Sequence, residues 1–399
     1  MDLLEPVTQP YAWGSHTVIA ELQGRPAPTA KPEAELWMGA HPSAPSGVER
    51  AGTRTTLDAV IAADPAGELG AECAARFGGR LPFLLKVLAA EQALSIQVHP
   101  SRAQAEAGYL AENERGLAPG DKSRNYVDDW PKPEILCALT PFEILAGMRS
   151  TADAAALLHA LGVSELAPLA TALASTPDQA ALSVALATIL TWPAAGRGAL
   201  VGDVAAACER IAARGGEYAA ACAATARLAG EHRGDLGIVA SLLLRHAVLR
   251  PGDAVFLPAG GLHAYLHGAG VELLANSDNV VRAGLTAKHV DVPELLKLTD
   301  PAVDVPVVEP RPLGGGVSVY DSPAPEFRLY RVELGPGEVT LPGGGARIVL
   351  CVDGVGTLRA SSGTLKVARG ESCYLSAADG AVAVSGPATA FIAGSGLDS

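Results

Sequence analysis

The residues whose types could do chemistry stand in three segments far apart in the sequence. In residues 95–100, polar and aliphatic side chains alternate, and one face of the implied strand carries a serine, Gln97 and His99. Alternation alone favours a half-solvated sheet face, because polar groups on a buried strand need partners. Two distant residues could supply those partners: Glu134 opens an apolar run, and His263 follows a Gly-rich turn.

Together these residues offer the donor set of a divalent-metal site. Two imidazoles, one carboxylate and one amide oxygen suit Zn²⁺ or a similar ion and suit a soft, thiophilic metal poorly. Each pair alone is weak support, but three segments that all place ligands on predicted strands are stronger. The sequence therefore indicates one metal held by Gln97, His99, Glu134 and His263.

The candidate ligands Gln97 and His99 stand at the end of the apolar run Leu81–Pro100, around which the chain is organised. Pro100 cannot donate to a β-ladder, so we expect the strand to stop there. Ser101 follows as the expected N-cap of a polar helix.

The third ligand is preceded by a proline-bracketed lysine. Pro131 and Pro133 exclude a helix and hold Lys132 extended, so Lys132 and Glu134 point the same way. A solvated turn is the alternative. Because the apolar run ILCAL follows Glu134 at once, we expect this carboxylate to face the core.

Strand character returns at Ala247, and we expect two strands joined by a Pro/Gly turn. His263, Tyr265 and His267 should share one face of the second strand. The order P-G-D, then P-A-G, then a histidine resembles the second motif of the cupin superfamily, in which that histidine projects into a barrel.

A weak internal repeat indicates a second barrel. RPGDAVFLPA, from Arg250, aligns with ARGESCYLSA, from Ala368. Eleven residues after Gly252 stands His263, but eleven after Gly370 stands Ala381. The C-terminal barrel should therefore lack a metal ligand and serve a structural role.

We thus expect a mainly β protein of cupin (jelly-roll) barrels, one metal-binding and one degenerate, with an α-helical domain inserted. Ala- and Leu-rich periods near 3.6 predict four or five helices in the insertion. The predicted units are 1–149, the first part of the catalytic barrel; 150–244, helical; 245–319, the rest of that barrel; and 320–399, the second barrel.

Composition limits the partners. The net charge of −13 argues against nucleic acid or an anionic membrane, so an anionic substrate would need a local cationic cluster. The six cysteines form no C-x-x-C, and no apolar run reaches spanning length. We expect a reduced, soluble, cytoplasmic protein, with a monomer as the simplest state.

Longer motifs resemble one family. LPFLLKVLAAEQALSIQVHP, PKPEILCALTPFEILAG, LPAGGLHAYLHGAGVELLANSDNVVRAGLTAKHVDV and ELWMGAHPSAPS are similar to type I mannose-6-phosphate isomerases over nearly the whole chain. The resemblance implies one zinc per chain, interconversion of mannose 6-phosphate and fructose 6-phosphate, and the four ligands above. It also implies an active-site arginine and three pocket residues: Arg282, Lys86, Lys132 and Tyr265.

Aldose–ketose isomerisation opens the sugar ring and moves a proton between C1 and C2 through an enediolate. It needs a base at carbon and positive charge where the oxyanion develops. Glu272 is the candidate proton carrier; a salt-bridged strand residue is an equal alternative. Arg282, Lys288 and Ser95 are the candidates for binding the phosphate.

The sequence departs from the family pattern at one place. Many members have His-Lys-Pro-Glu where this chain has Pro131-Lys132-Pro133-Glu134. The histidine proposed for ring opening in those relatives is therefore absent. Either His41 does that work, or ring opening is left to water and zinc.

Two other classes of protein compete with this interpretation. A metal-dependent cupin oxygenase would want three histidines and a glutamate, or a facial triad, and the Gln97 ligand argues against iron. A non-catalytic sugar-phosphate binder would need no proton-transfer set such as Lys86 and Glu272. The sequence leaves open the oligomeric state, the selectivity for mannose and the identity of the carbon proton carrier.

Overall fold

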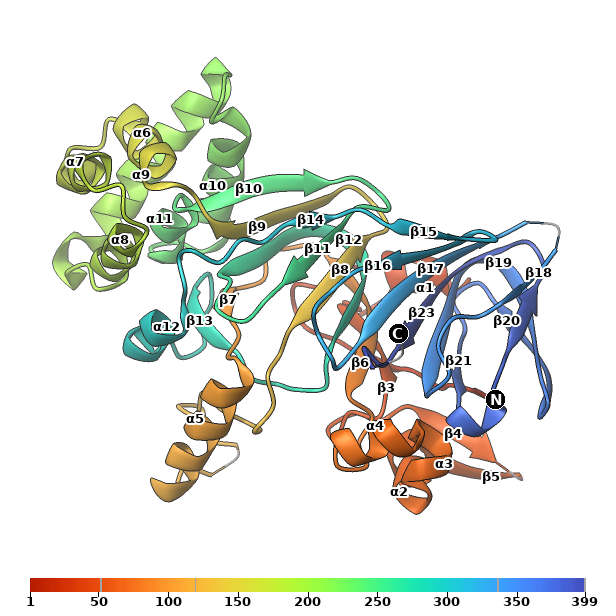
Figure 1. Cartoon of the computed structure of the whole chain (residues 1–399). Coiled ribbons are helices and arrows are strands. Elements are labelled where there is room, and N and C mark those ends of the chain that lie inside the picture. The colour runs from red at the N-terminus through yellow and green to blue at the C-terminus, as the bar shows by residue number, and fades with distance from the viewer. Residues whose placement is uncertain (51, 119, 336, 398–399) are drawn as a thin grey trace.

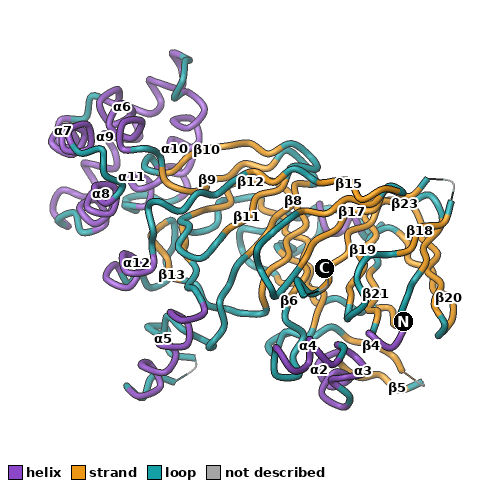
Figure 2. Tube along the Cα trace, in the orientation of Figure 1, coloured by secondary structure: helices purple, strands orange, loops and turns teal. Residues whose placement is uncertain are grey.

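The computed structural model describes residues 1–50, 52–118, 120–335 and 337–397. One of two large β-sheets occupies the middle of the molecule and the other forms one end, while a cluster of helices covers the opposite end (Figure 1). The remaining helices lie at the periphery of the sheets (Figure 2). The mainly β, two-barrel architecture with inserted helices confirms the expected fold class.

The first sheet contains eleven strands and carries the candidate ligands. Its long strand β12 joins both halves, because its first residues pair with β7 and β9 and its last eight pair with β6. The strands are β2 (Val7–Gln9), β3 (Glu35–Gly39), β6 (Phe83–Ala90), β7 (Ile96–Val98), β8 (Glu134–Ala138), β9 (Phe142–Met148), β10 (Leu244–Leu249), β11 (Ala254–Leu257), β12 (His263–Ala275), β13 (Val281–Gly284) and β14 (Val307–Val308).

Both faces of this sheet are buried, which explains its near-continuous apolar runs. On β8, Leu136 packs in the interior of the first barrel, whereas Ile135 and Cys137 pack against the second sheet. The half formed by β7, β9 and β13 turns its other face to the helices. A strand with two buried faces cannot show the clean alternation of a half-solvated one.

The second sheet contains ten strands around a core that includes Val332, Val349 and Ile392. Phe327, Tyr374 and other residues of its outer face pack against the first sheet. Its strands are β1 (Asp2–Leu3), β15 (Arg311–Gly314), β16 (Val317–Tyr320), β17 (Arg328–Leu334), β18 (Glu338–Thr340), β19 (Arg347–Ala360), β20 (Gly363–Ala368), β21 (Ser372–Leu375), β22 (Ala383–Ser385) and β23 (Ala388–Gly394).

The inserted helical region follows β9 and returns to the barrel at β10. It contains α6 (Thr151–Leu161), the 3₁₀ turn η1 (Ser164–Leu166), α7 (Ala167–Ser175), α8 (Ala180–Leu190), α9 (Ala194–Arg214), α10 (Ala219–Glu231) and α11 (Gly237–Ser241). In the described ranges no single helix is long and apolar enough to cross a membrane. Within the described part of the chain, only the pair α8 and α9 passes that test jointly, and the two helices are bent by 112° at their break.

The other elements cover the barrels. They are α1 (Val18–Leu22), β4 (Gly47–Arg50), β5 (Thr53–Thr56), α2 (Leu57–Ala63), α3 (Pro65–Leu69), α4 (Ala71–Arg76), α5 (Arg102–Glu114), α12 (Val292–Leu298) and the 3₁₀ turn η2 (Ala377–Asp379). Ser101 caps α5 as expected, in a capping box with Gln104.

Three local details differ from the sequence interpretation. Strand structure returns at Leu244, three residues early, and continues as three strands instead of two. A register shift between Tyr265 and His267 breaks the alternation of β12, so His267 is exposed while His263 and Tyr265 are buried. The second sheet also takes in β1 and β15, from regions that the sequence assigned to the other barrel; the unit boundaries stay a prediction.

Candidate metal centre

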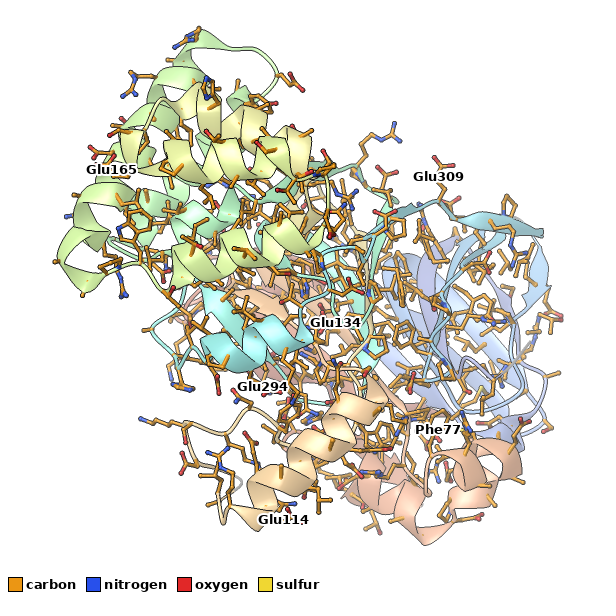
Figure 3. The ribbon with its side chains drawn as sticks, turned by 60° about the vertical axis from the view of Figure 1, so that its left-hand side comes forward. Phe77, Glu114, Glu134, Glu165, Glu294 and Glu309 are labelled. Atoms are coloured by element: carbon orange, nitrogen blue, oxygen red, sulfur yellow. The ribbon has the colours of Figure 1, made fainter. Side chains whose placement is uncertain are left out.

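Three of the predicted ligands converge at one point of the first barrel. His99 follows the last residue of β7, Glu134 is the first residue of β8, and His263 is the first residue of β12. One nitrogen or oxygen atom from each lies within 4.8 Å of the others. The three residues are buried, and Figure 3 shows Glu134 in the interior, near the middle of the molecule.

Backbone carbonyls orient both imidazoles. Nδ1 of His99 lies 2.8 Å from the carbonyl oxygen of Asn279, and Nδ1 of His263 lies 3.0 Å from that of Gly261. A carbonyl only accepts, so each Nδ1 carries the proton and each Nε2 presents a lone pair. Hydrogen bonds of this kind fix the tautomer of metal-ligating histidines.

The two Nε2 lone pairs face the Glu134 carboxylate. His99 Nε2 is 3.4 Å from Oε1, and His263 Nε2 is 3.7 Å from Oε2. His99 Nε2 and Glu134 Oε2 are buried without a hydrogen-bond partner in the described part of the chain. Acceptors that face one another in a buried site are explained by a cation bound between them.

Gln97 completes the donor set from the next strand. In the register of the sheet it lies directly opposite His263, and its Nε2 is 3.3 Å from His263 Nε2. A half-turn of the terminal amide torsion places Oε1 at the same point. An amide oxygen, a carboxylate and two neutral imidazoles fit a zinc ion.

The protonation states of these side chains suit metal binding. Burial lowers the pKa of His99 and lowers that of His263 to about 4. Burial by itself would raise the pKa of Glu134, but the charge of the Lys132 ammonium opposes burial, and that pKa lies well below its usual range. Metal ligands must be deprotonated, and near neutral pH these already are.

Lys132 lies beside the metal centre. The Pro131–Pro133 bracket keeps this segment extended, and Lys132 Nζ is 3.1 Å from Glu134 Oε1. Lys132 and Glu134 thus point the same way, and both are buried. The arrangement places a positive charge directly beside a candidate ligand.

A second buried polar cluster stands on the neighbouring strands. Lys86 of β6 lies opposite Glu272 of β12, and its Nζ is 3.3 Å from Glu272 Oε2 and 3.4 Å from Glu35 Oε2. Burial raises the pKa of Glu272 to about 7, although Lys86 opposes the shift. Burial by itself would lower the pKa of Lys86, but Glu35 and Glu272 outweigh it and raise that pKa.

Glu35 is a member of this cluster that the sequence analysis missed. Its carboxylate accepts a hydrogen bond of 2.6 Å from Trp37 Nε1, and Trp37 lies opposite Lys86 in the sheet. The segment ELWMGAHPSAPS stood out for its aromatic and histidine residues, and the alternation of Glu35 with Trp37 was the available signal.

Tyr265 and His41 border these clusters. The ring of Tyr265 is 5.9 Å from that of His263, its hydroxyl is buried, and burial raises its pKa well above the usual range. His41 Nε2 is 3.4 Å from Asp278 Oδ2, while its Nδ1 is 2.8 Å from Ser43 Oγ.

A cationic cavity opens beside Gln97. Arg282 of β13 lies opposite Gln97 in the register, and it lines a cavity of about 340 Å³ together with Lys288. Burial lowers the pKa of Arg282, and burial and Arg282 lower that of Lys288. Neither cation forms an ion pair with a carboxylate of the described ranges, and the Asp278 carboxylate, four residues before Arg282, lies beside His41 instead. Ser95 lies three residues before the end of β7 and does not line this cavity.

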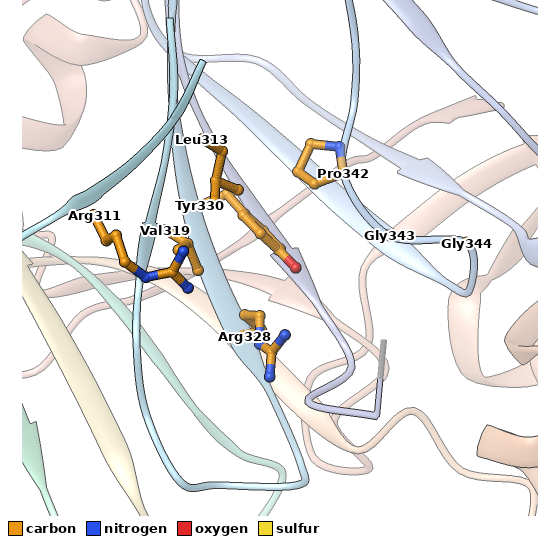
Figure 4. A pocket seen from close by; sticks show the side chains of 8 residues that line it. All are labelled: Arg311, Leu313, Val319, Arg328, Tyr330, Pro342, Gly343 and Gly344. Atoms are coloured by element: carbon orange, nitrogen blue, oxygen red, sulfur yellow. The ribbon is translucent and has the colours of Figure 1, made fainter. Parts of the chain in front are cut away.

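A larger cavity, of about 450 Å³, lies on the second barrel, where Arg311, Arg328 and Tyr330 contribute to its lining (Figure 4). None of the residues that line it belongs to the first sheet. The volume of a cavity therefore does not identify the functional site of this molecule, because the buried ligand set lies in the first barrel.

The fold and the donor set define a metal-binding cupin protein. Family models match at both ends of the chain: phosphomannose isomerase type I, catalytic domain, over residues 1–151, and mannose-6-phosphate isomerase, cupin domain, over residues 322–393. The mannose-6-phosphate isomerase of Escherichia coli (strain K12) is 37% identical over 382 residues, covering 95% of each chain. That of Homo sapiens is 34% identical over 361 residues, covering 84% of this chain and 82% of the other.

Comparison with solved structures leads to the same family. A zinc-bound mannose 6-phosphate isomerase superposes with a TM-score of 0.90 at 34% identity, covering 99% of each chain. A mutant of phosphomannose isomerase from Salmonella typhimurium gives 0.93 at 34% identity and covers both chains completely. The chain belongs to the type I mannose-6-phosphate isomerase family.

Proposed function

We propose that this protein is a zinc-dependent aldose–ketose isomerase that interconverts mannose 6-phosphate and fructose 6-phosphate. The observation that carries the proposal is the convergence of His99, Glu134 and His263, with both imidazoles held as neutral ligands. A buried lysine and a cationic cavity lie beside that group. The family relation supports the reaction and the metal.

In this proposal Gln97, His99, Glu134 and His263 hold the zinc. When bound, the zinc supplies a Lewis acid that polarises sugar oxygens at the reacting end of the substrate. The protein side chains around it then supply orientation and proton transfer. The Lys132 ammonium, beside Glu134, stabilises negative charge that develops on the enediolate oxygens.

Glu272 carries the proton between C1 and C2. A general base works best when its pKa is near the operating pH, and the buried Glu272 carboxyl has a pKa raised to about 7. Lys86 lies between Glu272 and Glu35 and keeps its charge, so it orients the base and balances it when ionised. Tyr265 lines the same region and limits the access of water.

Arg282 and Lys288 bind the phosphate. Two partly buried cations without a carboxylate partner in the described ranges are costly unless an anion binds them. A guanidinium offers two parallel donors to a phosphate, and the lysine adds a point charge. Ser95 stays a candidate from the sequence for the phosphate site, although it does not line this cavity.

Ring opening falls to His41 in this chain, because Pro131 replaces the histidine of many relatives. One ring nitrogen of His41 contacts Ser43 and the other contacts Asp278. An imidazole in such a position can accept a proton at one nitrogen and donate one from the other. We further propose that the protein acts in the cytoplasm as a monomer on this one small-molecule substrate.

Two other functions fit the structure less well. A cupin oxygenase fits poorly because the fourth ligand is an amide, which suits iron less than a histidine does. A simple binder would not need Glu272 with a pKa near 7 beside a buried lysine. An assay coupled to fructose 6-phosphate decides among the three: isomerase activity gives turnover without oxygen consumption, an oxygenase consumes oxygen, and a binder gives neither.

A further inference from the structure

One residue of the loop between β12 and β13 contacts two of the segments that carry the metal centre. Asn279 lies on this loop and is fully buried. It contacts His99 at the end of β7 and residues 127–130, which lead into Lys132 and Glu134.

The side chain of Asn279 is bonded entirely to the segment at 127–130. Its Oδ1 accepts from the backbone N–H groups of Val127 at 2.7 Å and Asp128 at 3.2 Å. Its Nδ2 donates to the carbonyl oxygens of Asp128 at 2.7 Å and Trp130 at 2.8 Å. An amide has two donors and an acceptor with two lone pairs, so this segment satisfies the whole group.

The segment is held in return by the loop. The Asp128 carboxylate accepts from Ser277 Oγ at 2.8 Å and from the backbone N–H of Asp278 at 2.9 Å. Buried and fully satisfied polar networks of this kind fix one arrangement of the chain.

The backbone of Asn279 has a separate task. Its carbonyl oxygen accepts the Nδ1–H of His99, which leaves Nε2 as the ligand atom. The position of this carbonyl depends on the side chain, because the amide, together with Ser277 and Asp278, fixes the loop to residues 127–130. One residue therefore couples the orientation of His99 to the position of that segment.

The segment at 127–130 is connected to Lys132 through the backbone. After Trp130 come Pro131, Lys132 and Pro133, and the two prolines leave little backbone freedom to absorb a shift. The carbonyl of Pro133 also accepts from the backbone N–H of Ala275 at the end of β12. A displacement at Trp130 is thus passed on to Lys132.

We propose that Asn279 is a positioning residue, which holds His99 as a metal ligand and Lys132 as the charge beside it through one amide group. The part that concerns Lys132 rests on the proposed isomerase function, while the part that concerns His99 does not. Asn279 is itself neither a proposed metal ligand nor a proposed substrate contact, and its effect passes through His99 and Lys132.

Two substitutions test the proposal. Asn279→Ala removes the amide, and Asn279→Asp keeps its volume and its acceptor but loses both donors. Zinc affinity, measured by competition with a chelator, should fall by about 10- to 100-fold in each. The d–d absorption of the cobalt(II)-substituted protein should also change, because it reports the geometry of the ligands. At saturating zinc, kcat should still be lower than in the unmodified protein.

A matched control separates positioning from loss of stability. Thr225→Val removes a buried hydrogen bond of 3.2 Å to Ser241 in the helical region, away from the metal centre. It should lower the melting temperature while it leaves zinc affinity and the cobalt spectrum unchanged. If Asn279→Ala does not fold, Asn279→Asp provides the measurement.

An unaltered zinc affinity and cobalt spectrum in the folded Asn279 variants would overturn the proposal, as would equal changes in Thr225→Val. Normal kcat at saturating zinc would remove the Lys132 part alone. If the unmodified protein shows no isomerase activity but the Asn279 variants still lose zinc, the proposed function fails and the positioning of His99 stands.

Discussion

The phosphate site gives the most quantitative prediction. Arg282 is partly buried and has no carboxylate partner in the described ranges, so a bound phosphate would be its charge partner. Truncating one side of a buried, hydrogen-bonded charge pair costs about 2–5 kcal/mol. Because Lys288 stays in the cavity and still attracts the phosphate, we expect Arg282→Ala to cost the lower part of that range. A loss of about 2–3.5 kcal/mol corresponds to roughly 30- to 300-fold in kcat/KM.

The assay compares two substrates. With mannose 6-phosphate as substrate, kcat/KM of Arg282→Ala should fall by roughly 30- to 300-fold. With free mannose, kcat/KM for any residual turnover should change by less than about threefold. Arg250→Ala is the control, because it changes the net charge of the protein by the same amount. Arg250 is exposed and pairs with Asp253. An equal loss on both sugars would place Arg282 at the reacting carbons, and no loss on either would refute its role.

The remaining predictions concern the reacting end of the substrate. Lys132→Ala should lower kcat by about 10²-fold or more while one zinc stays bound, and an unchanged kcat would remove Lys132 from the mechanism. Glu272→Gln should lower kcat by about 10²- to 10⁴-fold. In the unmodified protein kcat/KM should fall as pH drops below about 7, because the raised pKa of Glu272 leaves the base protonated there; a flat profile from pH 5 to 8 would contradict this assignment. Pro131→His should be tolerated and should speed ring opening, which pre-steady-state measurements on the cyclic sugar would detect.

Much of the architecture could be read from the chain because it depends on local patterns. The alternation at Gln97 and His99, the prolines around Lys132 and the Gly-rich turn before His263 each specify a short element. The Ala- and Leu-rich periods likewise predicted the inserted helices, although the described region has six α-helices instead of four or five. In each case the pattern and the structure lie within a few residues of one another.

The features that the sequence did not predict depend on long-range pairing. Glu35 stands in an apolar segment, and only the register of β3 against β6 brings it to Lys86. The register shift before His267 is followed by Gly268 (φ 126°), but a single glycine in a strand does not by itself specify where the pairing shifts. β1 pairs with β21 from the other end of the chain, a choice that local sequence does not determine. The hydrogen bonds of the Asn279 side chain join residues 149 to 152 positions apart.

The central claim is that one zinc, held by Gln97, His99, Glu134 and His263, makes this protein an isomerase. The most direct test is to titrate the metal-free protein with zinc while bound metal and formation of fructose 6-phosphate are measured in the same samples. Turnover should rise in proportion to bound zinc and stop at one ion per chain, and a variant with alanine at all four positions should show neither. Full turnover without metal, or stoichiometric zinc in that variant, would contradict the account.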